Sequence, residues 1–225
     1  MHTHTQPMQS EARRVSPAET EQRVILYGVS WETYERLLAE HEESSGTHFT
    51  YDQGRLEIMV LSAKHEKPSR VLALLVEVLA EEMGIDVEDL GSTTFKRKDL
   101  GRGFEPDSCF YVQNAERVRG KDNIDLTTDP PPDLLIEIDI TSPSLNKQPL
   151  FAALGIPEVW RYDGTRVMIV KLEAGEYVET PESIALPGVT SEALSHLLAA
   201  GIHEKRTAWL RQVREWARTR RTVRG

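Results

Sequence analysis

Cysteine, aromatic residues and long apolar runs are all scarce in this chain. Cys109 is the single cysteine among 225 residues, which argues against a disulfide framework. No stretch of 18 apolar residues occurs and no apolar run follows Met1, so neither a membrane span nor a secretion signal is expected. These features predict a cytoplasmic protein with no membrane partner. Because only 7% of the residues are aromatic, the stacking surface typical of a sugar-binding groove is also lacking.

Positive charge is concentrated at one end of the chain. Residues 205–225 hold eight Lys or Arg and one acid, Glu215, which gives this segment a net charge of +7 (8 − 1). Because the whole chain has a net charge of −9, the first 204 residues carry a net charge of −16 (−9 − 7). The composition predicts a polar, disordered N-terminal arm over 1–23, one domain over 24–202 and a basic C-terminal helix or tail over 203–225. Within that tail, we regard the arginines as weak candidates for phosphate contacts. They are Arg211, Arg214 and Arg218.

One apolar strand carries two acids on the same face. From Asp133 to Ile140 the residues alternate, with an aliphatic face opposite a face that holds Glu137 and Asp139. The two acids lie about 6.6 Å apart along an extended strand, in surroundings that would solvate them poorly. They therefore require a cation nearby, either a divalent metal or a basic side chain. Lys147 follows eight residues after Asp139.

A second acid is expected to meet Glu137 from a neighbouring strand. The run 103–112 predicts a strand that contains Asp107, and a polar loop over 114–132 is long enough to bring this strand alongside the first. Asp133 is the alternative, but it lies roughly 13 Å from Glu137 along the same strand, too far to share one ion. Asp107 is thus the better candidate, and Asp133 is expected to cap the entry to its strand.

The other expected elements alternate between strands and helices. A helix is predicted over 30–41 and another over 64–83, where His65 and Glu66 are interpreted as part of a solvated first turn. Hairpins are predicted over 48–60, with Gly54 left-handed at its turn, and over 158–172. The remaining elements are a short helix at 148–154 and a strand near 176–179.

Several of these motifs together resemble a known family. The segments EPDSCF, PPDLLIEIDITSPS and GIPEVWRYD, with YDQGRLEIM near the N-terminus, resemble the Uma two family of the PD-(D/E)XK endonuclease-like superfamily over about residues 29–201. The resemblance implies an α/β fold of the restriction endonuclease-like class, with a mixed central β-sheet flanked by helices and an N-terminal β-hairpin extension. It also implies a metal site for Mg²⁺ or Mn²⁺ made by Asp107 and Glu137. The superfamily lysine expected two residues after Glu137 is replaced by Asp139, and Lys147 occupies the position that matches the family's relocated lysine.

The implied chemistry is metal-dependent hydrolysis of a phosphodiester in DNA. Asp107, Glu137 and Lys147 form the expected catalytic set, with Asp139 as a further ligand or supporting residue, and Lys147 is expected to affect the rate more than the stability. The alternatives are an inactive nucleic-acid-binding or assembly protein that keeps the fold, a glycosidase, which we rank last, and a purely structural ion-paired cluster. A homodimer is expected by analogy with other nucleases of the superfamily.

Overall fold

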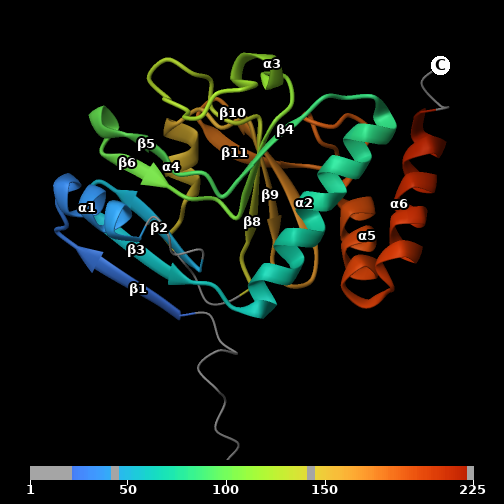
Figure 1. Ribbon diagram of the computed structural model, residues 1–225, viewed down its shortest axis with the longest axis horizontal. Helices are drawn as coiled ribbons and strands as arrows, with labels where there is room; N and C mark the ends of the chain where they lie inside the picture. Colours follow the sequence, from blue (N-terminus) through green and yellow to red (C-terminus); the bar gives the residue numbers. More distant parts are fainter. Residues whose placement is uncertain (1–21, 42–45, 141–144, 222–225) are drawn as a thin grey trace, which may run out of the picture.

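A six-stranded mixed sheet forms the centre of the molecule (Figure 1). The computed structural model describes residues 22–41, 46–140 and 145–221. The strand order of this sheet is β11-β10-β9-β8-β7-β4; β8 runs parallel to β9, and the other neighbours are antiparallel. The predicted mixed central sheet is confirmed. Its strands are β4 (Glu88–Gly91), β7 (Ser108–Tyr111), β8 (Leu134–Ile138), β9 (Glu158–Tyr162), β10 (Val167–Glu173) and β11 (Glu176–Thr180).

A second, antiparallel sheet contains the predicted N-terminal hairpin. Its strand order is β1-β3-β2-β6-β5, so the hairpin extension is part of a five-stranded sheet rather than an isolated pair. At the hairpin turn both Gln53 (φ 49°) and Gly54 (φ 91°) are left-handed, whereas only the glycine was expected to be. The strands are β1 (Gln22–Tyr27), β2 (Thr47–Asp52), β3 (Arg55–Val60), β5 (Phe95–Arg97) and β6 (Arg102–Phe104).

Three helices cover one face of the six-stranded sheet. Apolar residues of α2, α5 and α6 form one core with Leu134, Ile136 and Ile138 of β8. The predicted end of α2 at Gly84 is confirmed, because this glycine adopts φ 69° and donates to the last carbonyls of the helix. The helices are α1 (Trp31–His41), α2 (Ala63–Met83), α3 (Ala115–Val118), α4 (Gln148–Ala153), α5 (Ser191–His203) and α6 (Arg206–Arg221), with a 3₁₀ turn at Lys98–Leu100.

The opposite face of the sheet holds the acids. Leu135 on β8 and Val159 on β9 pack there with Phe151 of α4 in a separate apolar cluster. Because both faces of β8 are buried, its residues are nearly all aliphatic, and Glu137 is the exception on the α4 face. This arrangement places the acidic positions between the central sheet, α4 and the five-stranded sheet.

Two features differ from the sequence-based expectation. β1 begins at Gln22, so the last two residues of the predicted arm belong to a strand, and residues 1–21 lie outside the described part. Helix α5 was not predicted, although Thr190 caps it by accepting from Ala193 N at 3.2 Å. The expected C-terminal helix is α6, where Trp209 and Val213 are fully buried. Within the described residues, no helix is both long and apolar enough to cross a bilayer.

Candidate active site

Strand register brings Asp107 and Glu137 next to each other. In the antiparallel pair β7–β8, Ser108 lies opposite Ile136, so one further step places Asp107 opposite Glu137. Oδ2 of Asp107 accepts a hydrogen bond from the backbone N–H of Ile138 at 2.6 Å, which fixes this carboxylate at the end of β8. The single strand predicted over 103–112 is wrong, because this run is divided into β6 and β7 of different sheets and Asp107 lies just before β7; the loop over 114–132 nevertheless brings Asp107 next to Glu137. Asp133 instead accepts from Val112 N and Asn114 N at 2.8 and 2.9 Å and fixes the loop after β7.

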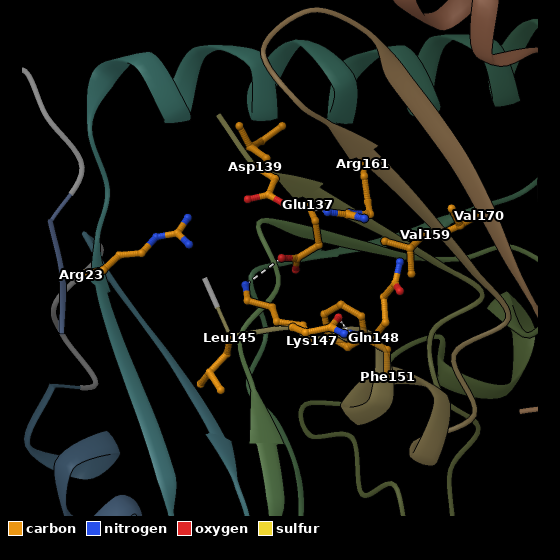
Figure 2. A pocket seen from close by; sticks show the side chains of 12 residues that line it. Arg23, Glu137, Asp139, Leu145, Lys147, Gln148, Phe151, Val159, Arg161 and Val170 are labelled. Carbon is orange, nitrogen blue, oxygen red and sulfur yellow. Dashed lines mark hydrogen bonds and ion pairs between the residues drawn. The ribbon is translucent and has the colours of Figure 1, made fainter. Parts of the chain in front are cut away.

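Lys147 enters the same site from the start of α4. Its Nζ donates to Oε2 of Glu137 at 2.7 Å, and the two side chains are only 11% and 9% exposed (Figure 2). Among the described residues, Oε1 of Glu137 and Oδ1 of Asp107 are buried without a hydrogen-bond partner. Two carboxylate oxygens with unused lone pairs therefore lie beside one buried ammonium group.

Two histidines flank Asp107. Nε2 of His65 lies 3.3 Å from Oδ2, and Nδ1 of His48 lies 3.4 Å from Oδ1. The interpretation of His65 as part of a solvated first turn is wrong, since it is 1% exposed and faces the acid from α2. The local sequence carries no signal for this contact, because His65 on α2 and Asp107 before β7 are 42 residues apart in the chain (107 − 65).

The electrostatics of the site are dominated by burial. Burial raises the pKa of Glu137, and the charge of Lys147 offsets this rise only in part. Burial would also raise the pKa of Asp107, but its contacts with His48 and His65 outweigh that effect and lower the pKa below its usual value. For Lys147, burial opposes the charged form, while the neighbouring carboxylates raise its pKa.

A third buried acid comes from the N-terminal hairpin. Glu57 on β3 is 1% exposed and accepts from the backbone N–H of Leu145 at 3.0 Å. Its charge contributes to the raised pKa of Lys147. The signal that could have identified it is a lone acid in the otherwise apolar run LEIMV. Glu57 therefore links the five-stranded sheet to the segment that carries Lys147.

Asp139 binds an arginine rather than joining the first two acids. Nη2 of Arg161 on β9 donates to Oδ2 of Asp139 at 2.6 Å. Both side chains line a cavity of about 220 Å³ that also includes Glu137 and Lys147 (Figure 2). Asp139 is thus a partner of Arg161 at the edge of the site.

The oxygen atoms present fit a hard divalent cation. Carboxylate oxygens are the ligands that Mg²⁺ and Mn²⁺ prefer, and Mg²⁺ commonly uses one or two carboxylates and retains several waters. Oδ1 of Asp107 and Oε1 of Glu137 supply such a pair. Within the described ranges, no group of three or more His, Cys, Asp and Glu side chains has the geometry of a complete protein cage. An ion here would therefore keep open positions for water and phosphate.

Comparisons with known proteins identify the family of this chain. A family model described as "Uma2: Putative restriction endonuclease" matches residues 31–207, which is more than half of the chain. The chain belongs to the Uma two family. A crystal structure of "a putative nuclease belonging to DUF820 from Anabaena variabilis" is similar at 16% identity and a TM-score of 0.44, over 67% of this chain and 90% of that one. No curated protein sequence matches the chain.

The basic helix of this Uma two protein lies away from the acids. In Figure 1, α6 is on the far side of α2 as seen from α4. Nη1 of Arg214 binds both Glu81 and Glu82 at 2.9 Å, and Nε of Arg218 binds Glu82 at 2.9 Å. These ion pairs favour a packing role for α6. We therefore leave Arg211, Arg214 and Arg218 out of the proposed site.

Proposed function

We propose that this protein is a metal-dependent endonuclease that hydrolyses phosphodiester bonds in DNA. The observation that carries the proposal is a pair of buried carboxylates beside the buried ammonium of Lys147: Oε1 of Glu137 has no hydrogen-bond partner among the described residues, and Oδ1 of Asp107 has only a long 3.4 Å contact with Nδ1 of His48. Leaving such groups unsatisfied costs about 1–3 kcal/mol each, a cost that a bound cation would remove. Membership of a family of restriction endonuclease type supports the same reaction.

In this proposal each side chain has a distinct role. Asp107 and Glu137 hold Mg²⁺ or Mn²⁺, and the bound ion supplies Lewis-acid polarisation of the phosphate and a water of lowered pKa. Lys147, which donates to Glu137 at 2.7 Å, would be placed to donate to the phosphate oxygen on which charge develops. His65 and His48 orient the carboxylate of Asp107 from α2 and β2. These two histidines are therefore positioning residues.

Cleavage of DNA with added metal tests the reaction. Supercoiled and linear DNA should be cut in the presence of Mg²⁺ or Mn²⁺, and EDTA should stop the reaction. Glu137→Gln should abolish cleavage, because an amide oxygen is a much weaker ligand for a hard cation. Arg166→Gln is a matched control, since Arg166 lies in the β9–β10 turn and pairs with Glu179. Failure of the unmodified protein to cut with either metal would contradict the proposal.

The alternative is a catalytically inactive protein that binds nucleic acid or assembles with partners. It predicts DNA binding that is unaffected by Glu137→Gln and no cleavage with either metal. The buried, paired state of Lys147 and Glu137 is compatible with this alternative as a structural cluster. The two unsatisfied carboxylate oxygens favour the enzyme, because a purely structural cluster has no need of them.

We further propose that two copies associate through β1. Within the described residues this strand pairs with β3 along one edge, so its other edge has backbone groups available for pairing. Val24 and Leu26, which are 54% and 42% exposed, share one face of β1, and Tyr27, which is 75% exposed, lies on the other; a second β1 paired along this edge would give them apolar cross-strand neighbours. Leu26→Lys should convert a dimer into a monomer in sedimentation velocity. A wild-type monomer at micromolar concentration would contradict the proposal.

A further inference from the structure

A second, larger cavity adjoins Asp107. It has a volume of about 790 Å³ and is lined by α1, β2, the segment between β4 and β5, and the loop that follows α3. Two of its lining residues lead directly to the site, because Nδ1 of His48 lies 3.4 Å from Oδ1 of Asp107 and Glu105 is two residues before Asp107 in the chain. Pockets that enclose small organic ligands measure about 300–1,000 Å³. This space is therefore large enough for a nucleobase with its sugar.

His48 lies between this cavity and Asp107. Its side chain is only 9% exposed, and Nδ1 faces the carboxylate of Asp107. Within the described part of the chain, the other ring nitrogen, Nε2, makes no hydrogen bond, and it is not sealed from solvent as Nδ1 is. Because an ionised carboxylate only accepts hydrogen bonds, Nδ1 carries the proton of the neutral ring and Nε2 is left as an acceptor. A side chain that is more than nine-tenths buried thus presents an unused acceptor to the cavity.

The charged groups on the cavity wall are acidic in sum. Four acids and two lysines line the space. Of the lysines, Lys96 already pairs with Glu35. The other, Lys121, pairs with Asp129. Asp122 is exposed on the wall, and its carboxylate has no partner within the described ranges. Such a wall repels a phosphate and offers acceptors to neutral N–H groups.

Apolar side chains complete the lining. Phe49 of β2 is 2% exposed, and the ring of His41 stands edge-on to it with 5.5 Å between the ring centroids. Leu38 of α1 and Ile124 of the loop after α3 are half-buried on the same wall. A flat aromatic ligand buries its faces against side chains of this kind, and its polar edge then meets the acceptors.

We propose that this cavity binds one unstacked base of the nucleic acid substrate and prefers the amino-bearing bases adenine, cytosine and guanine to thymine. Their amino groups donate to Nε2 of His48 and to the carboxylate of Asp122, whereas thymine has no amino group. The inference rests on the proposed endonuclease function, since it takes nucleic acid as the ligand, and it places the base beside the phosphodiester that is cut. The cavity is then a source of base preference, which contacts to phosphate cannot supply.

Binding of free nucleosides to the full-length protein in EDTA tests this inference without metal or cleavage. The probes are deoxyadenosine, deoxycytidine and thymidine, with inorganic phosphate as a competing anion, and the affinities are measured by NMR titration. Deoxyadenosine and deoxycytidine should bind about 10-fold more tightly than thymidine, the effect of one good contact to a base edge. Inorganic phosphate should not displace them, because the wall is acidic.

Variants on the cavity wall separate this site from other parts of the surface. Ala39 is an exposed residue of α1 on the wall, so Ala39→Trp should fill the space and abolish binding of every nucleoside. Ala208→Trp makes the same change at an exposed position of α6, and this matched control should bind like the wild type. His48→Phe removes the Nε2 acceptor and Asp122→Ala removes the carboxylate, so each should reduce the preference over thymidine. Asp122 is exposed, so its variant keeps the test available if His48→Phe does not fold.

Three results would overturn the inference. They are the absence of nucleoside binding by the wild type, equal affinities of the wild type for thymidine and for the amino-bearing nucleosides, and wild-type affinities in Ala39→Trp. Thermal melting shows which variants are folded and can be compared.

These outcomes are distinct from those that test the reaction. If the protein cuts DNA, mapped cut sites should show an amino-bearing base at one fixed position relative to the cut, and Ala39→Trp should remove that preference. Cleavage without nucleoside binding would overturn the base pocket and leave the endonuclease. Nucleoside binding with the expected preference but without cleavage would leave the pocket and overturn the endonuclease.

Discussion

Replacing Lys147 by Met should reduce the stability of the metal-free protein and the activity of the protein in Mg²⁺. Methionine keeps the apolar stem but removes the ammonium, so Glu137 is left with a buried side chain that is 9% exposed and has no cation beside it. Breaking one partner of a buried ion pair costs about 3–5 kcal/mol. For a protein of this size, about 3 kcal/mol corresponds to a fall in melting temperature of roughly 6–12 °C. This prediction differs from the expectation based on sequence alone that Lys147 affects the rate and hardly the stability, and neither has been tested.

A double-mutant cycle shows whether the loss comes from the ion pair. Lys147→Met/Glu137→Gln should recover part of the loss in EDTA, because the uncompensated charge is gone. Lys171→Met is the control, since Lys171 pairs with Glu173 at the surface, and its cost should be about 0–1 kcal/mol. Mg²⁺ should raise the melting temperature of Lys147→Met more than that of the wild type, because the ion takes the place of the ammonium.

The activity of the same variant completes the experiment. Loss of one electrostatic stabiliser lowers the rate by about 10²-fold or more, measured as single-turnover DNA cleavage in saturating Mg²⁺. The stabilising role of the buried ion pair would be refuted if Lys147→Met melts within about 2 °C of the wild type in EDTA and the two substitutions have additive effects on stability in the double-mutant cycle. Unchanged cleavage would refute the catalytic role while leaving the pair intact.

Three further changes test other parts of the molecule. Asp107→Asn should abolish cleavage and remove the stabilisation by Mg²⁺ in thermal melts, with a fold that is retained in circular dichroism. Arg214→Gln should leave cleavage unchanged in a plasmid assay, because this side chain already binds Glu82 on α2. A large loss of cleavage would instead indicate that α6 contacts DNA. Gly103→Ala should destabilise the protein by about 1–3 kcal/mol in urea unfolding, since the added Cβ would lie 2.4 Å from the hydroxyl of Tyr34.

Local patterns predicted the elements well wherever one period was dominant. The alternation in β8 correctly separated the α2 face from the face with Glu137, and β9 was predicted with the observed bounds of Glu158–Tyr162. Helix α5 had comparable signals that were missed, since Thr190 caps it and Leu194, Leu197 and Leu198 are buried at helical spacing. This omission was one of interpretation, because the pattern itself is present in the chain.

The contacts of the site could not be predicted in the same way. His48, Glu57 and His65 come from β2, β3 and α2, and each is buried at the site although its element is not adjacent in sequence to β8. Periodicity within an element shows which face is apolar, but it does not show which polar residue on that face will meet an acid from another strand. The pairing of Asp139 with Arg161 is of the same kind, because it depends on the register between two parallel strands.

That pairing gives a physical account of the altered acid–x–lysine pattern. Position 139, two residues after Glu137, lines the same cavity as Arg161. The parallel register between β8 and β9 places Arg161 beside Glu137. A lysine at 139 would lie against the guanidinium and repel it, whereas Asp139 holds it at 2.6 Å. With 139 acidic, the cation for Glu137 must come from another element, and Lys147 supplies it from the start of α4. With aspartate at 139 and lysine at 147, the site therefore keeps a lysine beside Asp107 and Glu137 and adds an oriented arginine, Arg161, next to them.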